Sequence, residues 1–290
     1  MERQPSLWMA TITGVASNLD CVGLGVHDHA GMDRLVTMAV RGAERLGEVG
    51  GVSVLRWQDP SGARLILGMR RNEVVDLLPS YAGTPGARLA NVRAVNDDVA
   101  VADVLDEDGQ LVTMLAAEVE QRRLLPAVTG TVHEMACVVA LGVDVTVWPD
   151  KDAFEASDDS LFGDDGEDPG EAPPDVVEQG LPWPPRMAAE SFISYGVFGD
   201  PEQAQAYARL NGTVLRAQRK TVAATGQEFV AARVRTVGFE ADVCLPVDGA
   251  GELPSAGNVI AGTVFLVASL PGVAPAAGPR GRRSWLPWRR

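Results

Sequence analysis

Three histidines and their acidic neighbours are the residues whose chemistry could bind a metal ion. His27 and His29 flank Asp28, and His133 directly precedes Glu134. Imidazole and carboxylate groups from different strands can converge on a divalent cation, so His27, His29, His133 and Glu134 are the candidate ligands. The favoured alternative is that Asp28 caps the helix that follows, with the histidines at the surface.

Nucleophilic catalysis is not favoured by the spacing of Cys and His. Cys21 lies six residues before His27, about 20 Å along an extended strand, and Cys137 lies four residues after His133, about 13 Å. A nucleophile needs a positioned base closer than that. Two early glycines also lack the third glycine of a dinucleotide-binding fingerprint. We therefore expect no cofactor, and a protein that is not an enzyme is favoured.

A second group of candidates is basic and lies on the C-terminal strands. Two of its members, Arg233 and Arg235, share one face of a strand because their spacing is two. This patch would suit an anionic ligand, whereas the alternative is an ordinary charged surface. The candidate binding residues are Arg216, Arg219, Lys220, Arg233 and Arg235.

The last eleven residues, 280–290, carry five Arg, two Trp and no acid. Exposed Trp is costly, so this tail fits a partner groove, an anionic membrane surface or the chain's own acidic segment. A disordered end is the alternative. The candidate binding residues of the tail are Arg282, Arg283, Trp285 and Trp288.

Charge and composition restrict the partners and the compartment. The net charge of −14 disfavours nucleic acid, because phosphate binding needs a positive surface. No apolar run is long enough for a membrane span, and the N-terminus lacks a signal-peptide pattern. Three scattered cysteines fit a reducing compartment. The sequence predicts a cytoplasmic protein with a protein partner or self-association.

An acidic segment divides the chain. Residues 150–178 hold twelve acids against Lys151, and six prolines fall between residues 169 and 185. Such a segment cannot bury enough apolar surface to order itself, so residues 157–185 are predicted to be an exposed linker. The run could also dock a basic partner or mimic nucleic acid, although a solvated linker is favoured.

Before the linker the pattern predicts one helix on an antiparallel sheet. Cys21–His27 is typical of a strand, and apolar residues from Met32 to Leu46 follow a helical period. Later apolar runs predict strands joined by turns at 59–62 and 106–109. The long run at 130–147 is expected to break into two strands at Gly142.

After the linker four or five short strands with glycine-bearing turns predict a small closed β-barrel of the OB-like kind. The expected fold class is α+β, a helix-on-antiparallel-sheet domain followed by this barrel. The expected divisions are 1–156, the mixed domain; 157–185, the linker; 186–272, the barrel; and 273–290, the basic tail.

Three stretches resemble a group of uncharacterised bacterial proteins without a known activity: 188–193 with 196–198, 225–229 with 232–238, and 262–266. This resemblance implies a shared architecture, mainly over residues 130–272. The strand–helix–hairpin start, with the turn 59–62 before an apolar strand, resembles the vicinal oxygen chelate metalloenzymes. That resemblance implies a metal held by a His near a first strand and a Glu near a last one.

From these observations we expect a non-enzymatic binding or adaptor protein that acts through protein–protein contacts. The alternative is a metal-dependent enzyme of the vicinal oxygen chelate type.

Overall fold

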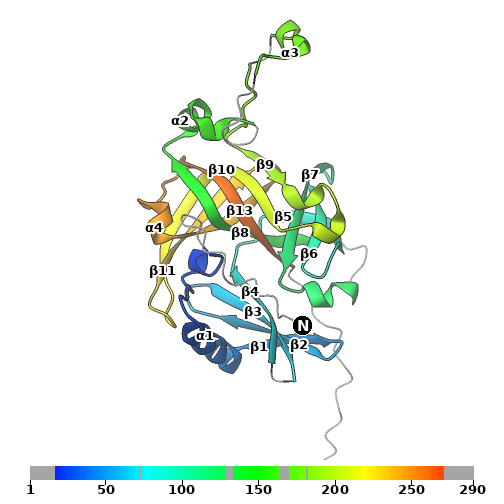
Figure 1. Ribbon diagram of the computed structural model, residues 1–290, viewed down its shortest axis with the longest axis vertical. Coiled ribbons are helices and arrows are strands. Elements are labelled where there is room, and N and C mark those ends of the chain that lie inside the picture. Colours follow the sequence, from blue (N-terminus) through cyan, green and yellow to red (C-terminus); the bar gives the residue numbers. More distant parts are fainter. Residues whose placement is uncertain (1–16, 72, 128–132, 163–169, 181, 271–290) are drawn as a thin grey trace, which may run out of the picture.

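The computed structural model describes residues 17–71, 73–127, 133–162, 170–180 and 182–270, and these form an α+β fold that is mostly sheet. The expected α+β class is confirmed. Figure 1 shows a smaller sheet with α1 beneath a larger sheet. The elements are η1 (Asp20–Val22), α1 (His29–Gly42), β1 (Glu44–Val49), β2 (Val52–Gln58), β3 (Ala63–Arg70), β4 (Glu73–Tyr81), β5 (Ala87–Ala94), β6 (Val99–Leu105), β7 (Leu111–Val119), η2 (Arg122–Ala127), β8 (His133–Trp148), α2 (Lys151–Ala156), η3 (Asp158–Ser160), α3 (Pro174–Glu178), β9 (Ser191–Ser194), η4 (Tyr195–Val197), η5 (Pro201–Gln203), β10 (Tyr207–Thr221), β11 (Glu228–Thr236), β12 (Phe239–Pro246), α4 (Val247–Ala250) and β13 (Val259–Ser269).

The smaller sheet, sheet A, is antiparallel in the order β1-β2-β3-β4 and carries α1. Asp28 caps this helix by accepting the Gly31 N–H at 2.5 Å. The apolar period predicts a helix as far as Leu46, which is too long. The helix ends at Gly42, because the chain then enters β1 and pairs with β2. Since a Cβ on Gly42 would lie 3.2 Å from the Trp57 ring, glycine permits this close approach.

The expected strand Cys21–His27 is wrong. Its first residues form η1, and Gly23 then turns the chain with φ +67°. Side chains of the β10–β11 connection hold this segment. The Thr225 hydroxyl donates to the Gly23 carbonyl at 2.7 Å. The Gln227 side-chain amide accepts the Gly25 N–H and donates to the Gly25 carbonyl, both at 2.8 Å. These contacts satisfy backbone groups that a strand neighbour would otherwise satisfy.

The larger sheet, sheet B, has nine strands in the described residues, in the order β11-β12-β8-β5-β6-β7-β13-β10-β9. Additional pairings of β11 with β10 and of β8 with β13 close it on itself. One ring of paired strands runs β8-β12-β11-β10-β13. A second runs β8-β5-β6-β7-β13. Ring closure removes exposed strand edges, and the two rings share β8 and β13.

The shared strands explain two long apolar runs in the sequence. A strand between two rings is covered on both faces, so it is apolar almost throughout instead of alternating. Residues 136–143 of β8 and 264–269 of β13 are accordingly buried. The expected break at Gly142 is wrong, because β8 is one strand of 16 residues. Gly142 instead lets β12 approach, since its Cβ would lie 2.3 Å from Leu245.

The alternation of side chains in the C-terminal strands predicts eight inward-facing core positions. Seven of these eight are 1% exposed or less, and the eighth, Ala231, is half-buried. The buried seven are Val214, Phe229, Val234, Val243, Val259, Val264 and Leu266. None of the helices in the described ranges is long and apolar enough to cross a membrane.

The division of the chain at residues 157–185 separates hydrogen-bonded strands. Strand β8 precedes this segment, whereas its neighbours β12 and β13 follow it. We therefore expect limited proteolysis within residues 157–185 to give two fragments that stay associated in gel filtration under native conditions. Fragments that separate and remain folded would instead support two independent domains.

Candidate functional site

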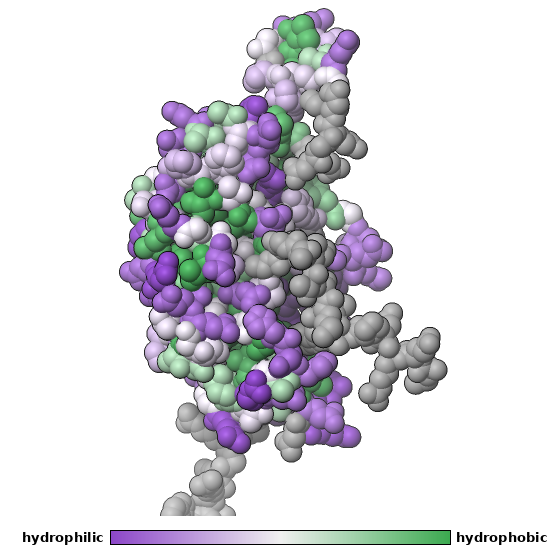
Figure 2. All heavy atoms as spheres, turned by 60° about the vertical axis from the view of Figure 1, so that its left-hand side comes forward, coloured by the Kyte–Doolittle hydropathy of each residue, from purple (hydrophilic) through white to green (hydrophobic). Residues whose placement is uncertain are grey.

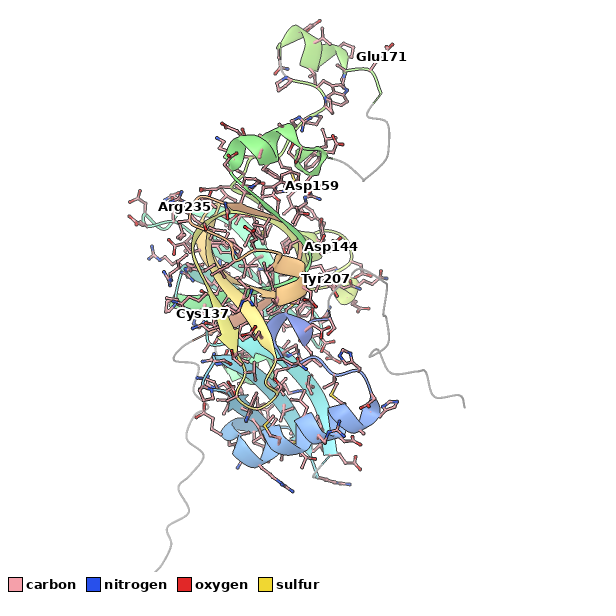
Figure 3. All side chains as sticks on the ribbon, turned by 90° about the vertical axis from the view of Figure 1, so that its left-hand side faces the viewer. Cys137, Asp144, Asp159, Glu171, Tyr207 and Arg235 are labelled. Carbon is pink, nitrogen blue, oxygen red and sulfur yellow. The ribbon has the colours of Figure 1, made fainter. Side chains whose placement is uncertain are left out.

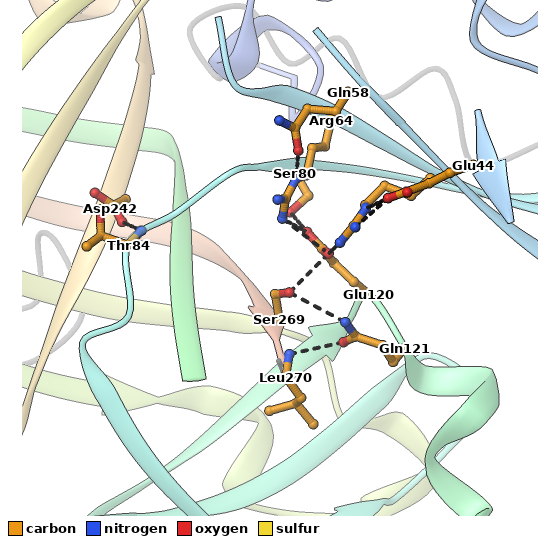
Figure 4. Close-up of polar contacts among 11 residues, drawn as sticks. Glu44, Gln58, Arg64, Ser80, Thr84, Glu120, Gln121, Asp242, Ser269 and Leu270 are labelled. Atoms are coloured by element: carbon orange, nitrogen blue, oxygen red, sulfur yellow. Dashed lines mark hydrogen bonds and ion pairs between the residues drawn. The ribbon is translucent and has the colours of Figure 1, made fainter. Parts of the chain in front are cut away.

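A buried carboxylate, Glu120, lies where sheet A meets sheet B (Figure 4). It accepts hydrogen bonds from Ser80 at 2.7 Å, Ser269 at 3.1 Å and Arg64 at 3.1 Å. Arg56 adds a second guanidinium at 3.8 Å. Strands β2, β3, β4 and β13 thus supply partners to a carboxylate that follows β7, and this Glu120 cluster joins the two sheets.

The Glu120 cluster has little room for a ligand. The adjoining cavity, lined by Gly68, Val119 and Arg123 among others, has a volume of about 10 Å³. This volume corresponds to about one water molecule. Because the Glu120 carboxylate is buried and bonded to fixed partners, the arrangement suits holding two sheets together rather than turning over a substrate.

A second buried ion pair joins β11 to β12, close to the connection from β4 to β5. Arg233 is 3% exposed, contacts Asp242 at 3.0 Å and Glu240 at 2.9 Å, and donates to the Thr84 carbonyl at 2.8 Å. Burial raises the pKa of Asp242 although the Thr84 N–H and Arg233 oppose the shift. Burial also raises the pKa of the nearby Cys137 thiol, which leaves it a poor nucleophile.

A third charged group, the Arg122 cluster, joins β4, β7, η2 and the β5–β6 turn. Arg122 contacts Glu118 and Asp76 and lies 3.4 Å from Asp98, while Arg123 lies 3.3 Å from Asp76. Three carboxylates therefore share two guanidinium groups. Burial raises the pKa of Glu118 to about 7, and Asp98 and Asp76 add to the rise although Arg122 opposes it.

The Arg122 cluster predicts a pH-dependent stability. The pKa of Glu118 is about 7 in the folded chain against an ordinary value of 4.5, so the folded state binds this proton more tightly. Protonation of Glu118 therefore stabilises the folded state fully below pH 4.5, and this stabilisation is lost as the pH rises to about 7. Glu118→Gln should therefore raise the free energy of unfolding at pH 8 by up to about 3 kcal/mol, and by less at pH 5.

Urea unfolding of both chains at the two pH values measures this difference. The control is Glu48→Gln, which changes an exposed carboxylate paired with Arg45. A gain that is the same at pH 5 and pH 8 contradicts the assignment to Glu118.

A projecting segment, the arm, extends from the described fold. We define the arm as residues 161–186, of which 161–162, 170–180 and 182–186 are described. Leu161 bridges to Arg186 at its base, and the Phe162 N–H donates to the Pro185 carbonyl at 2.9 Å. Farther out, the Trp183 indole donates to the Gly170 carbonyl at 3.0 Å. Figure 1 shows the arm extending from α2 to α3, away from both sheets.

The surface of the arm combines apolar and acidic side chains. Val177 on α3 is 64% exposed, and Phe162 at the base is 59% exposed. Figure 2 shows apolar side chains at the outer end of the arm surrounded by hydrophilic ones, and Figure 3 places Glu171 there and Asp159 near the base. The arm sequence carries seven acids against one base, Arg186.

The predicted basic patch on the C-terminal strands is divided by the fold. Arg233 is buried in its ion pairs, while Arg235 pairs with Glu190 at 2.9 Å and Arg219 pairs with Glu228 at 3.4 Å. Bonding to Arg235 lowers the pKa of Glu190. The other two candidates, Arg216 and Lys220, are exposed and half-buried on β10.

The predicted metal ligands lie at separate places. His27 and His29 are exposed beside the Asp28 cap, whereas His133 is buried at the start of β8, where burial lowers its pKa. The side chain of Glu134 lies outside the description. Among the residues that are described, no group of three His, Cys, Asp or Glu side chains is placed to hold a metal. The metal-dependent alternative stays a prediction, tested by the metal content of the purified protein.

The tail candidates Arg282, Arg283, Trp285 and Trp288 lie outside the described residues. Sequence reasoning missed the Glu120 cluster, although one signal was present: Glu120 and Glu118 come two positions apart, directly after the apolar residues 114–117. Compared with protein-family models, curated proteins and solved structures, the chain matches none of them.

Proposed function

We propose that this chain is a binding or adaptor protein that holds a protein partner through the arm. The observation that supports the proposal best is the exposure of Val177 and Phe162 on a segment that projects from the body. Single exposed apolar residues are common on protein surfaces, but here two large ones lie on one projecting segment.

Charge defines the chemistry of the partner that we propose. With seven acids and one base, the arm favours a partner segment that carries Lys or Arg beside apolar side chains. Opposite charges speed encounter and select the partner, whereas desolvated apolar side chains supply most of the affinity. As part of the same proposal we keep the OB-like barrel, supported by the ring β8-β12-β11-β10-β13, as the rigid body behind the arm.

The test is affinity purification from the native host with matched variants. Proteins held by the wild-type chain should be lost with Val177→Asp and retained with Val75→Asp, a control at a valine on β4 that is 46% exposed. The purified partner should then bind the wild-type chain directly, and about tenfold or more weakly with Val177→Asp. Identical partners and affinities for wild type and Val177→Asp would overturn the proposal.

A further inference from the structure

We propose that the tail, residues 280–290, folds back on its own chain and binds a surface near the end of β13, the aromatic–acidic face. This face lies on the turn between β5 and β6 and on the segment that holds η4 and η5. All of its residues are described: Asp97, Asp98, Tyr195, Phe198, Asp200 and Glu202. The inference is independent of the arm and of the proposed function.

Asn96 joins the two parts of the aromatic–acidic face. Its side-chain NH₂ group donates to the carbonyls of Ala204 at 2.9 Å and Pro201 at 3.3 Å. Its side-chain oxygen accepts the N–H groups of Asp98 at 3.0 Å and Val99 at 2.8 Å. The acidic turn and the segment with η5 are therefore held side by side, and the yellow-green segment lies next to β6 and β7 in Figure 1.

The exposed side chains of this face are aromatic rings and carboxylates. Tyr195 is 45% exposed and Phe198 is 68% exposed. Within the part of the chain that is described, the exposed carboxylates of Asp97, Asp200 and Glu202 have no cation at ion-pair distance. The fourth, Asp98, lies 3.4 Å from Arg122, which it shares with two other acids.

The tail supplies the groups that this face lacks. It carries five Arg, two Trp and no acid. A guanidinium group binds a carboxylate through two parallel hydrogen bonds, and an indole packs against a Tyr or Phe ring edge to face or offset. The charges and the aromatic side chains of the two segments are therefore complementary.

Strand β13 brings the chain close to the aromatic–acidic face. Glu118 of β7 pairs with Val267 of β13 on one side and with Val99 of β6 on the other. Two strand spacings, about 10 Å, separate Val99 from Val267, and Leu270 lies about 10 Å farther along β13. The described chain therefore ends within about 20 Å of the turn that holds Asp98.

The remaining chain is long enough to reach the face. Residues 271–279 span up to about 32 Å when extended, and Trp285 and Trp288 lie 15 and 18 residues beyond Leu270. A short tether holds the tail at an effective concentration of the order of millimolar, so binding within one chain is favoured over binding between copies. Reach alone does not select the site, so the test compares this face with acids elsewhere.

The rate of trypsin cleavage after Arg282 and Arg283 in the full chain measures the docking, because trypsin cuts only an undocked tail. Cleavage of the wild-type chain should be tenfold or more slower than cleavage of the free peptide 271–290. It should stay equally slow on dilution, because the tail binds its own chain. The pair Asp200→Asn, Glu202→Gln should raise the rate threefold or more. Asn can still accept the Glu202 N–H that Asp200 accepts, so η5 is retained.

Two control pairs have the same charge change. Glu107→Gln, Asp108→Asn lies in the β6–β7 turn, at the opposite end of β7, and Glu171→Gln, Glu178→Gln lies on the arm. Both should leave the wild-type rate unchanged. The inference is overturned by a wild-type tail that is cut as fast as the peptide, by protection that is lost on dilution, or by a control pair that acts as strongly as the test pair. None of these results changes the test of the arm by Val177→Asp.

Discussion

Replacing Arg64 with Ala should destabilise the fold by about 3–5 kcal/mol, because it leaves the buried Glu120 carboxylate without its closest positive partner. Arg56 lies farther away, at 3.8 Å, and is already paired with Glu44, so it compensates only in part. The free energy of unfolding from urea titration at pH 7 measures the loss.

A second substitution distinguishes the lost ion pair from a general packing defect. Adding Glu120→Gln to Arg64→Ala removes the unpaired charge and should recover part of the loss. The control is Arg45→Ala, which breaks an exposed ion pair with Glu48 and should cost less than 1 kcal/mol by the usual range of about 0–1 kcal/mol. If Arg64→Ala costs no more than this control, the Glu120 cluster does not hold the sheets together.

Replacing Phe229 with Ala should lower the free energy of unfolding by about 3–5 kcal/mol, because it removes a fully buried phenyl group from β11. The Phe229 side chain meets Tyr81 of sheet A edge to face, with the ring centroids 5.8 Å apart. The substitution thus empties a position inside sheet B and removes a contact to sheet A. Thermal and urea unfolding should both show the loss.

The matched control is Phe198→Ala, which removes a ring that is 68% exposed. Its cost should stay within about 0.5 kcal/mol, as for most surface substitutions. A cost below about 1 kcal/mol for Phe229→Ala would mean that Phe229 is not a core residue of the ring β8-β12-β11-β10-β13.

Local signals in the sequence predicted the hairpins well. Asp59-Pro60-Ser61-Gly62 joins β2 to β3 as expected, with Gly62 at φ +100°. The sequence could not show that Asp59 also accepts the N–H groups of Ala223 and Ala224, at 3.1 and 3.2 Å. Burial opposes ionisation there, but the N–H donors prevail and lower the pKa of Asp59.

The basic candidates show why side-chain exposure is harder to predict. A spacing of two correctly places Arg233 and Arg235 on one face of β11, yet only Arg235 reaches the surface. The connection after β4 covers Arg233, and a Cβ on Gly86 would lie 1.9 Å from its guanidinium. Such a contact joins residues almost 150 positions apart, and no period or propensity within one strand encodes it.

The position of β13 in the chain has a consequence for biosynthesis. Sheet A is built from consecutive hairpins, so its strands can pair soon after residues 44–81 leave the ribosome. Both rings of sheet B close only through β13, the last strand described, which pairs with β7, β8 and β10. The sheet formed by β5 to β8 therefore keeps unpaired strand edges while more than a hundred further residues are translated. A chaperone that shields strand edges during that interval would act on this half-built sheet, and the acidic segment that is made in between keeps the nascent chain charged while it waits.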